Sequence, residues 1–169
     1  MKLKSIVLSV LILVVFQSFG QKNVKIGHIN TSDLIQKLPE FTKAQQAIEK
    51  QGKMFENQIN VLVSEYTTKV EAYKELSGDM TSAIREDKET EIMQLEERIK
   101  KFQKRAENES QKKRQELMDP IIKSVENAVN EVAKEEKYDY ILDTSSGVVL
   151  FSKDSDDITL LVKKKLGIN

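Results

Sequence analysis

Residues 42–77, TKAQQAIEKQGKMFENQINVLVSEYTTKVEAYKELS, contain the pattern that decides the fold. This stretch has no proline, and its apolar or small residues return at steps of three and four. These positions are Ala44, Ile48, Gly52, Phe55, Ile59, Leu62, Tyr66, Val70, Tyr73 and Ser77. The stripe is narrow and the other faces are charged, so the pattern predicts a helix that pairs with one neighbour. At ~1.5 Å per residue this helix is roughly 54 Å long.

A second stripe follows Ser77-Gly78-Asp79, where we expect the glycine to end the first helix in the left-handed conformation. The same spacing continues at Met80, Ile84, Ile92, Leu95, Ile99, Phe102 and Ala106. A tight turn makes two helices antiparallel neighbours, so residues 41–119 are predicted to form a coiled-coil arm. The stripe thins after Ala106, which predicts weak packing there, and Asp119-Pro120 predicts a kink or a restart of the helix.

The segments on either side of the arm predict a small body that contains β-structure. Residues 24–29 alternate apolar and other side chains, as a short strand does. Residues 138–143 and 148–151, separated by the loop 144–147, predict a β-hairpin, and a helix follows with Ile158 and Val162 on one face. We therefore expect an α+β fold that is mostly α, with a body of residues 21–40 and 120–169.

The predicted strands are too short and too few to cover their own edges and both faces. Association of several copies pairs such edges and shares a core between subunits, so we expect an oligomer. The residues expected in this shared body are Ile26, Ile29, Tyr140, Leu142, Val149 and Phe151. The spacing does not specify the number of copies.

The first twenty residues predict a cleaved secretory signal peptide. Lys2 and Lys4 precede an apolar run over residues 6–16, and the small residues Ser18 and Gly20 suit cleavage between Gly20 and Gln21. An uncleaved anchor is the alternative, although the run is short for a membrane span. Lys2 and Lys4 are the only charged residues in 1–20, so cleavage takes the formal net charge from 0 to −2. This balance excludes an electrostatic case for nucleic-acid binding.

Catalytic or metal chemistry has little support in the sequence. Cysteine is absent, and the only histidine, His28, lies on a predicted strand without a cluster of ligands around it. The acidic pairs Glu96-Glu97 and Glu135-Glu136 are typical of a solvated helix surface. There is no glycine-rich phosphate loop. We therefore expect no enzymatic activity, no cofactor and no metal.

Two sets of residues on the arm are candidates for binding. Met54, Val61 and Met93 are apolar but lie off the pairing stripe, and methionine adapts its shape to varied apolar partners. Single apolar residues are also common on ordinary surfaces. The basic residues Arg98, Lys100, Lys101, Lys104 and Arg105 are mixed with glutamates, which favours a salt-bridged helix face over an anion site. A lipid headgroup, if one binds the arm, would bind at this basic run.

Two stretches resemble the Skp (OmpH-like) periplasmic chaperone family. They are Lys25-Ile26-Gly27-His28-Ile29-Asn30-Thr31 through Pro39-Glu40-Phe41, and residues 138–143 through Val148-Val149-Leu150-Phe151 to Asp156-Asp157-Ile158-Thr159. With the arm, the resemblance spans essentially the whole mature chain. It implies a periplasmic homotrimer whose strands form a central barrel and whose arms surround a cavity. Unfolded outer-membrane proteins are held in that cavity without ATP.

The chain departs from the family in its charge, because well-known members are strongly basic and this mature chain is slightly acidic. The departure weakens the case for contact with lipopolysaccharide or membrane. An alternative function of a different class is a structural coiled-coil adaptor of the envelope that binds one defined folded partner. The identity of the clients and the splay of the arms are beyond what the pattern specifies.

Overall fold

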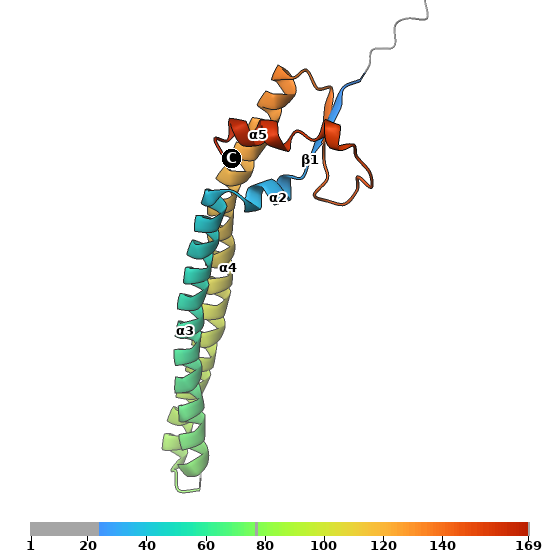
Figure 1. Cartoon of the computed structure of the whole chain (residues 1–169). Helices are drawn as coiled ribbons and strands as arrows, with labels where there is room; N and C mark the ends of the chain where they lie inside the picture. The colour runs from blue at the N-terminus through green and yellow to red at the C-terminus, as the bar shows by residue number, and fades with distance from the viewer. Residues whose placement is uncertain (1–23, 77, 169) are drawn as a thin grey trace, which may run out of the picture.

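The computed structural model describes residues 24–76 and 78–168. The predicted signal peptide and its cleavage site lie outside these residues. Figure 1 shows a long two-helix arm that projects from a small body, so the mostly α, α+β fold is confirmed. Among the helices of the described part of the chain, none combines the length and the apolar character needed to cross a membrane.

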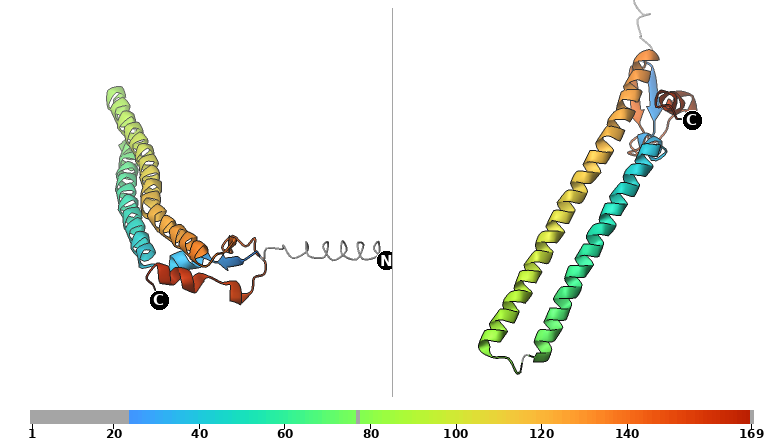
Figure 2. Two further views of the ribbon diagram at one scale, coloured as in Figure 1. Left: turned by 90° about the horizontal axis from the view of Figure 1, so that it is seen from above. Right: turned by 90° about the vertical axis from the view of Figure 1, so that its left-hand side faces the viewer.

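The arm consists of α3 (Pro39–Leu76) and the first part of α4 (Ser82–Glu135). Proline suits the first position of α3 because its missing N–H is not needed there. Thr81 caps α4, since its side-chain oxygen accepts a hydrogen bond from the backbone N–H of Ile84 at 3.4 Å. The views in Figures 1 and 2 agree that the two helices run side by side, which confirms the predicted antiparallel hairpin.

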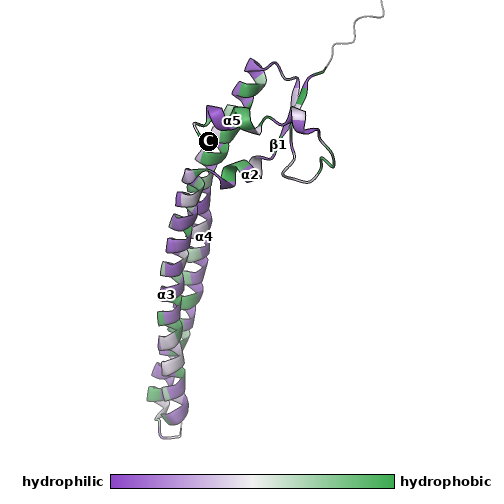
Figure 3. Ribbon diagram, viewed as in Figure 1, coloured by the Kyte–Doolittle hydropathy of each residue, from purple (hydrophilic) through white to green (hydrophobic). Residues whose placement is uncertain are grey.

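A narrow apolar seam holds the two helices of the arm together. Its buried side chains are Ala44, Leu62, Leu95 and Ala106. The rings of Phe55 and Phe102 meet edge to face with 6.0 Å between their centroids. Nearer the tip, the Nζ atom of Lys69 lies 3.0 Å from Oε2 of Glu91. Figure 3 shows hydrophilic and hydrophobic residues alternating along both helices of the arm.

The left-handed conformation expected of Gly78 stays a prediction, because its φ angle depends on residue 77, which lies outside the described residues. At Asp119-Pro120 the sequence predicts a kink or a restart of the helix, and α4 does not restart but continues through Pro120. Figures 1 and 2 show α4 bending as it leaves the arm, and the missing proline N–H accounts for a bend there.

The body is built around β1 (Ile26–Ile29), which pairs in parallel with β2 (Tyr140–Asp143). In this register Gly27 lies opposite Ile141. On the other side of β1, His28 forms an isolated β-bridge with Asp157. The helix α2 (Thr31–Gln36), the end of α4 and the helix α5 (Thr159–Lys165) surround this sheet. They bury a core of Ile29, Leu34, Leu38, Ala44, Ile121, Val125, Ala128, Val132, Ile158 and Val162.

The predicted C-terminal β-hairpin is wrong in the single chain. Residues 148–151 form no strand and make no backbone hydrogen bond within the part of the chain that the structure describes. β2 pairs with β1 along one edge, to which it is parallel, and its other edge has no partner among the described residues. Only the short helix Asp154–Asp156 and the bridge at Asp157 then lead the chain to α5.

We predict that Gly27→Ala destabilises the body by about 1–3 kcal/mol, the usual cost of overpacking. A Cβ at this position would lie 2.9 Å from Cε1 of Tyr138 and 3.0 Å from Cγ2 of Ile158. Tyr138 is partly buried and packs against the core of the body, so its ring has little room to move. Denaturant unfolding followed by circular dichroism, at one protein concentration, measures the change.

Gly52→Ala is the matched control. Its added Cβ meets no atom within 4 Å, and alanine favours a helix interior over glycine by up to about 1 kcal/mol. This substitution is expected to raise the unfolding midpoint. A Gly27→Ala variant as stable as the unmodified protein would contradict the close packing of β1 against Tyr138.

Candidate functional site

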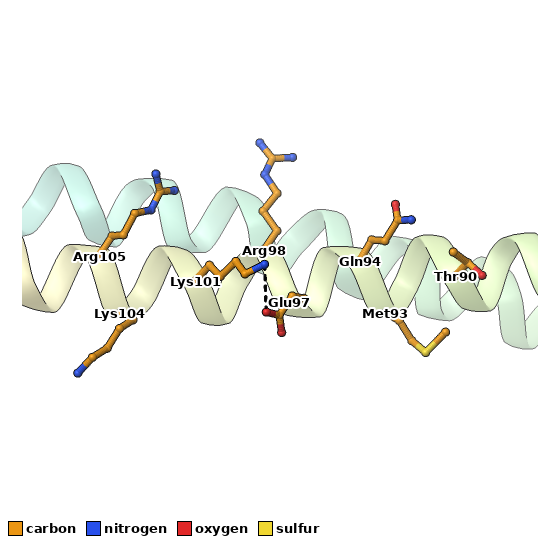
Figure 4. A pocket seen from close by; sticks show the side chains of 8 residues that line it. All are labelled: Thr90, Met93, Gln94, Glu97, Arg98, Lys101, Lys104 and Arg105. Atoms are coloured by element: carbon orange, nitrogen blue, oxygen red, sulfur yellow. Dashed lines mark ion pairs between the residues drawn. The ribbon is translucent and has the colours of Figure 1, made fainter.

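The three apolar residues predicted to bind clients are all exposed on the arm, with 60–63% of each side chain accessible. Met54 and Val61 lie on α3, each directly before a seam residue, so both are on the same flank of that helix. Figure 4 shows Met93 on α4 pointing away from α3. The structure therefore brings Met54 and Val61 onto one face and leaves Met93 on another.

A shallow hollow of about 920 Å³ runs along α4 beside Met93. It is lined by Thr90, Met93, Gln94, Glu97, Arg98, Lys101, Lys104 and Arg105, all from this one helix. Figure 4 shows that Arg98 and Arg105 extend toward the side on which α3 lies, whereas Lys104 points the other way with Met93. The basic run predicted from the sequence thus divides between two faces of α4.

All three lysines of the basic run are ion-paired on the helix surface, as expected. Lys100 lies 2.7 Å from Glu96, Lys101 lies 3.3 Å from Glu97, and Lys104 lies 3.2 Å from Glu107. The hydrogen bond to Glu96 raises the pKa of Lys100, so this lysine stays charged. These contacts are exposed and each contributes little to stability. They confirm a salt-bridged face for these three lysines.

The two arginines of the run are different. Neither Arg98 nor Arg105 makes an ion pair within the described residues. The guanidinium carbon of Arg105 lies 5.8 Å from the centroid of the Phe102 ring, and Arg98 has no such contact. Helical spacing separates Arg98 from the lysines, because it has no glutamate three or four residues away, whereas Arg105 has Glu109 at that spacing and still makes no ion pair within the described residues.

The body carries a second exposed apolar surface. Of the residues predicted to lie in a shared body, Ile26, Tyr140, Leu142 and Phe151 are exposed and Val149 is partly exposed. Ile29 is only 1% exposed and belongs to the core of its own chain, so it is not available to another subunit. Leu150, which is 95% exposed, and Val148 extend the surface. Ile26, Leu142, Val149 and Phe151 line a hollow of about 270 Å³ beside β1.

A surface hollow lies at the base of the arm, next to the body. It has a volume of about 450 Å³ and lies between the start of α3 and the region of α4 around Pro120. Leu117 and Ile121 line it from α4, and Leu38 and Ala44 line it from the other side. Leu166, just after α5, closes one end.

His28 links two segments of the body. Its ring is partly buried, and Nε2 lies 2.9 Å from the backbone oxygen of Lys153, which ties β1 to the segment after residues 148–151. No group of three side chains within the described residues is arranged to hold a metal ion. The acidic pair Glu135-Glu136 contacts lysines, with Glu135 2.5 Å from Lys165 and Glu136 3.9 Å from Lys25. These arrangements stabilise the body.

Comparison with known proteins adds the following findings. Residues 25–166 match the family model described as outer membrane protein (OmpH-like). The chain is 31% identical over 122 residues to the chaperone protein Skp of Vibrio cholerae, which covers 72% of each protein. It is 25% identical over 167 residues to the chaperone protein Skp of Blochmanniella pennsylvanica, covering 99% of this chain and all of that one. A putative outer membrane chaperone (OmpH-like) from Caulobacter crescentus has the same fold, with a TM-score of 0.71 at 10% identity over 87% and 86% of the two chains.

Proposed function

Because the chain belongs to the OmpH-like family, we propose that it is an ATP-independent holding chaperone that binds unfolded outer-membrane proteins between helical arms. Its relatives in Vibrio and Blochmanniella are named as chaperones and not as enzymes. Holding a client requires exposed contact surface and no catalytic group. The arm supplies that surface, and this is the observation on which the proposal rests.

The exposed apolar residues of the arm are suited to weak and repeated contact. Met54, Val61 and Met93 are separated from one another and surrounded by charged side chains. Each one adds a small contact with an apolar segment, and none forms a deep pocket that would select a single shape. A surface of this kind binds many unfolded sequences and keeps the arm soluble between encounters.

We further propose that three copies assemble through the body into a homotrimer. Residues 148–151 offer unpaired backbone groups beside β1 and β2, and Val148, Leu150 and Phe151 are among the most exposed apolar residues of the described chain. Unpaired edges and exposed apolar patches of this kind are normally covered in a stable protein. A closed ring of bodies would cover them and direct all the arms to one side.

The proposed working compartment is the periplasm. The lysines and apolar run of residues 1–20 support export, with cleavage between Gly20 and Gln21. A holding chaperone that needs no nucleotide fits a compartment outside the cytoplasmic membrane.

We predict that residues 21–169, purified without nucleotide, suppress the aggregation of several unrelated unfolded β-barrel proteins. The triple substitution Met54→Ser, Val61→Ser and Met93→Ser is expected to weaken client binding by about tenfold or more. The loss of even roughly 60 Å² of apolar contact corresponds to ~1.5 kcal/mol. Light scattering on dilution from urea reports aggregation, and fluorescence anisotropy of a labelled client reports affinity.

The control for this triple variant is Asn57→Ser, Asn60→Ser and Gln103→Ser, which alters exposed polar positions of the same arm. It is expected to protect clients as the unmodified protein does. Failure of the unmodified protein on every client, together with recovery of one folded partner in fixed stoichiometry, would favour the structural adaptor instead.

We predict a trimer by native mass spectrometry and a shift to monomer in the double variant Leu150→Ser and Phe151→Ser. Both side chains are highly exposed in the single chain, so the substitutions remove contact between subunits without opening the core. Leu76→Ser, an equally apolar change at the exposed end of α3, is expected to leave the trimer intact. A monomeric unmodified protein would rule out the shared body.

A further inference from the structure

The hollow at the base of the arm is formed by segments that are far apart in the sequence. Its apolar lining comes from the residue before α3, from α3 and α4, and from the residue after α5, namely Leu38, Ala44, Leu117, Ile121 and Leu166. Leu38, Ala44 and Ile121 are buried and belong to the core of the body, so they form the floor. Leu117 and Leu166 are partly exposed and form apolar walls. The hollow is therefore part of the folded body, not a gap beside one helix.

Pro120 gives this hollow a backbone hydrogen-bond acceptor. In a regular α-helix each carbonyl accepts a hydrogen bond from the N–H four residues later, and proline has no N–H. Because α4 continues through Pro120, the backbone carbonyl of Glu116 lacks that donor. The ring of a helical proline lies against the carbonyl four residues before it, and Pro120 lines the hollow. The carbonyl of Glu116 is therefore available at the edge of an apolar surface.

The size and the charge of the hollow limit what can fill it. Its volume of about 450 Å³ is toward the lower end of the ~300–1,000 Å³ of typical ligand pockets. The charged residues that line it are Glu40 and Lys43, whose charges cancel. Apolar walls, no net charge and one acceptor suit a neutral, flat group that carries a hydrogen-bond donor. Among protein side chains, tryptophan and tyrosine fit this description.

We propose that this hollow binds a tryptophan or tyrosine side chain of an unfolded outer-membrane protein. The ring would cover Leu117 and Leu166, and its N–H or O–H would donate a hydrogen bond to the carbonyl of Glu116. Membrane β-barrels carry girdles of aromatic residues at both membrane interfaces, so an unfolded client offers this group repeatedly. This inference rests on the proposed holding function and adds one site with a defined preference to the weak contacts of the arm.

A second copy of the chain is the other occupant that the hollow could receive. Residues 148–151, which carry the proposed contact between copies, do not line the hollow. Its acceptor also lies on α4 beside Pro120, where the arm leaves the body (Figure 1), and the arm is the proposed binding surface for clients. A client side chain is therefore the occupant that we propose. Coverage by a second copy is an outcome of the test that would overturn the proposal.

The test uses the complete mature protein, which contains no tryptophan, so the tryptophan of a bound peptide can be followed by its own fluorescence. Three peptides share one sequence of glycine, serine and leucine around a central tryptophan, 1-methyltryptophan or leucine. The ring nitrogen of 1-methyltryptophan carries no hydrogen. The tryptophan peptide is expected to bind about two- to tenfold more tightly than the 1-methyltryptophan peptide, the usual net effect of one hydrogen bond. Its emission should shift to shorter wavelength, and the leucine peptide should displace it only weakly.

Pro120→Ala restores the N–H that donates to the carbonyl of Glu116 in a regular helix. This variant is expected to bind the tryptophan and 1-methyltryptophan peptides equally, because the acceptor is then occupied within α4. Alanine favours a helix interior over proline, so α4 is expected to stay folded. A role of Pro120 in folding alone would not change the ratio of the two affinities.

Ser124→Phe places a ring in the hollow from an exposed position that lines it. This variant is expected to abolish the emission shift and to lower the affinity for the tryptophan peptide to that for the leucine peptide. The matched control is Asn130→Phe, which adds the same ring at an exposed position of α4 that does not line the hollow. The control is expected to bind the tryptophan peptide as the unmodified protein does.

Three results would overturn the proposal. They are equal affinity of the unmodified protein for the tryptophan and 1-methyltryptophan peptides, an unchanged ratio of these affinities in Pro120→Ala, and loss of the trimer in Ser124→Phe without any emission shift in the unmodified protein. The last result would mean that a second copy fills the hollow. The proposed function is judged separately, by light scattering with β-barrel clients. If the unmodified protein fails to suppress aggregation, the holding function is wrong whatever the peptides show.

Discussion

The structure depends on one helix, α4, which takes part in two different packing arrangements. Along the arm it shares a narrow seam with α3, in which Leu95 and Ala106 are buried. Beyond Pro120 it presents a wider apolar face, with Val125 and Val132 in the core of the body. Because the helix is continuous, the orientation of the arm is tied to the body. α4 bends where its packing against α3 ends and its packing in the body begins.

The path of the chain through α4 also explains why β1 and β2 are parallel. The arm carries the chain away from β1 and back again, so the chain returns to the body from the far end of α4 and enters β2 beside and parallel to β1. A parallel pair requires a long connection, and the arm is that connection. The residues that follow β2 are then left without a partner in the single chain. The exposed apolar surface of the body therefore comes from the unpaired residues that follow β2. The contact surface of the arm comes from the residues of α3 and α4 that lie off the seam.

Much of the arm could be predicted from its residues. Steps of three and four over residues 42–77 and again from Met80 to Ala106 determine two helices, and the turn between them determines that they are antiparallel. The off-seam positions of Met54, Val61 and Met93 predict exposure, which the structure confirms. What the pattern could not provide is the pairing across the helices. A stripe indicates which side of a helix is buried, but not that the ring of Phe55 meets that of Phe102 or that Lys69 meets Glu91.

The sequence by itself determined the long helical hairpin, the strand near Ile26–Ile29 and the strand near Tyr140–Asp143, because these depend on local periodicity and residue type. Only the tertiary structure decided that β2 pairs with β1 instead of with residues 148–151, that Ile29 is enclosed in its own chain, and that Pro120 lies within a continuous helix. Short apolar runs predict a strand equally well with any neighbour, and a single proline is tolerated where surrounding packing supports the helix. Contacts distant in sequence settled the pairing of β2 and the burial of Ile29.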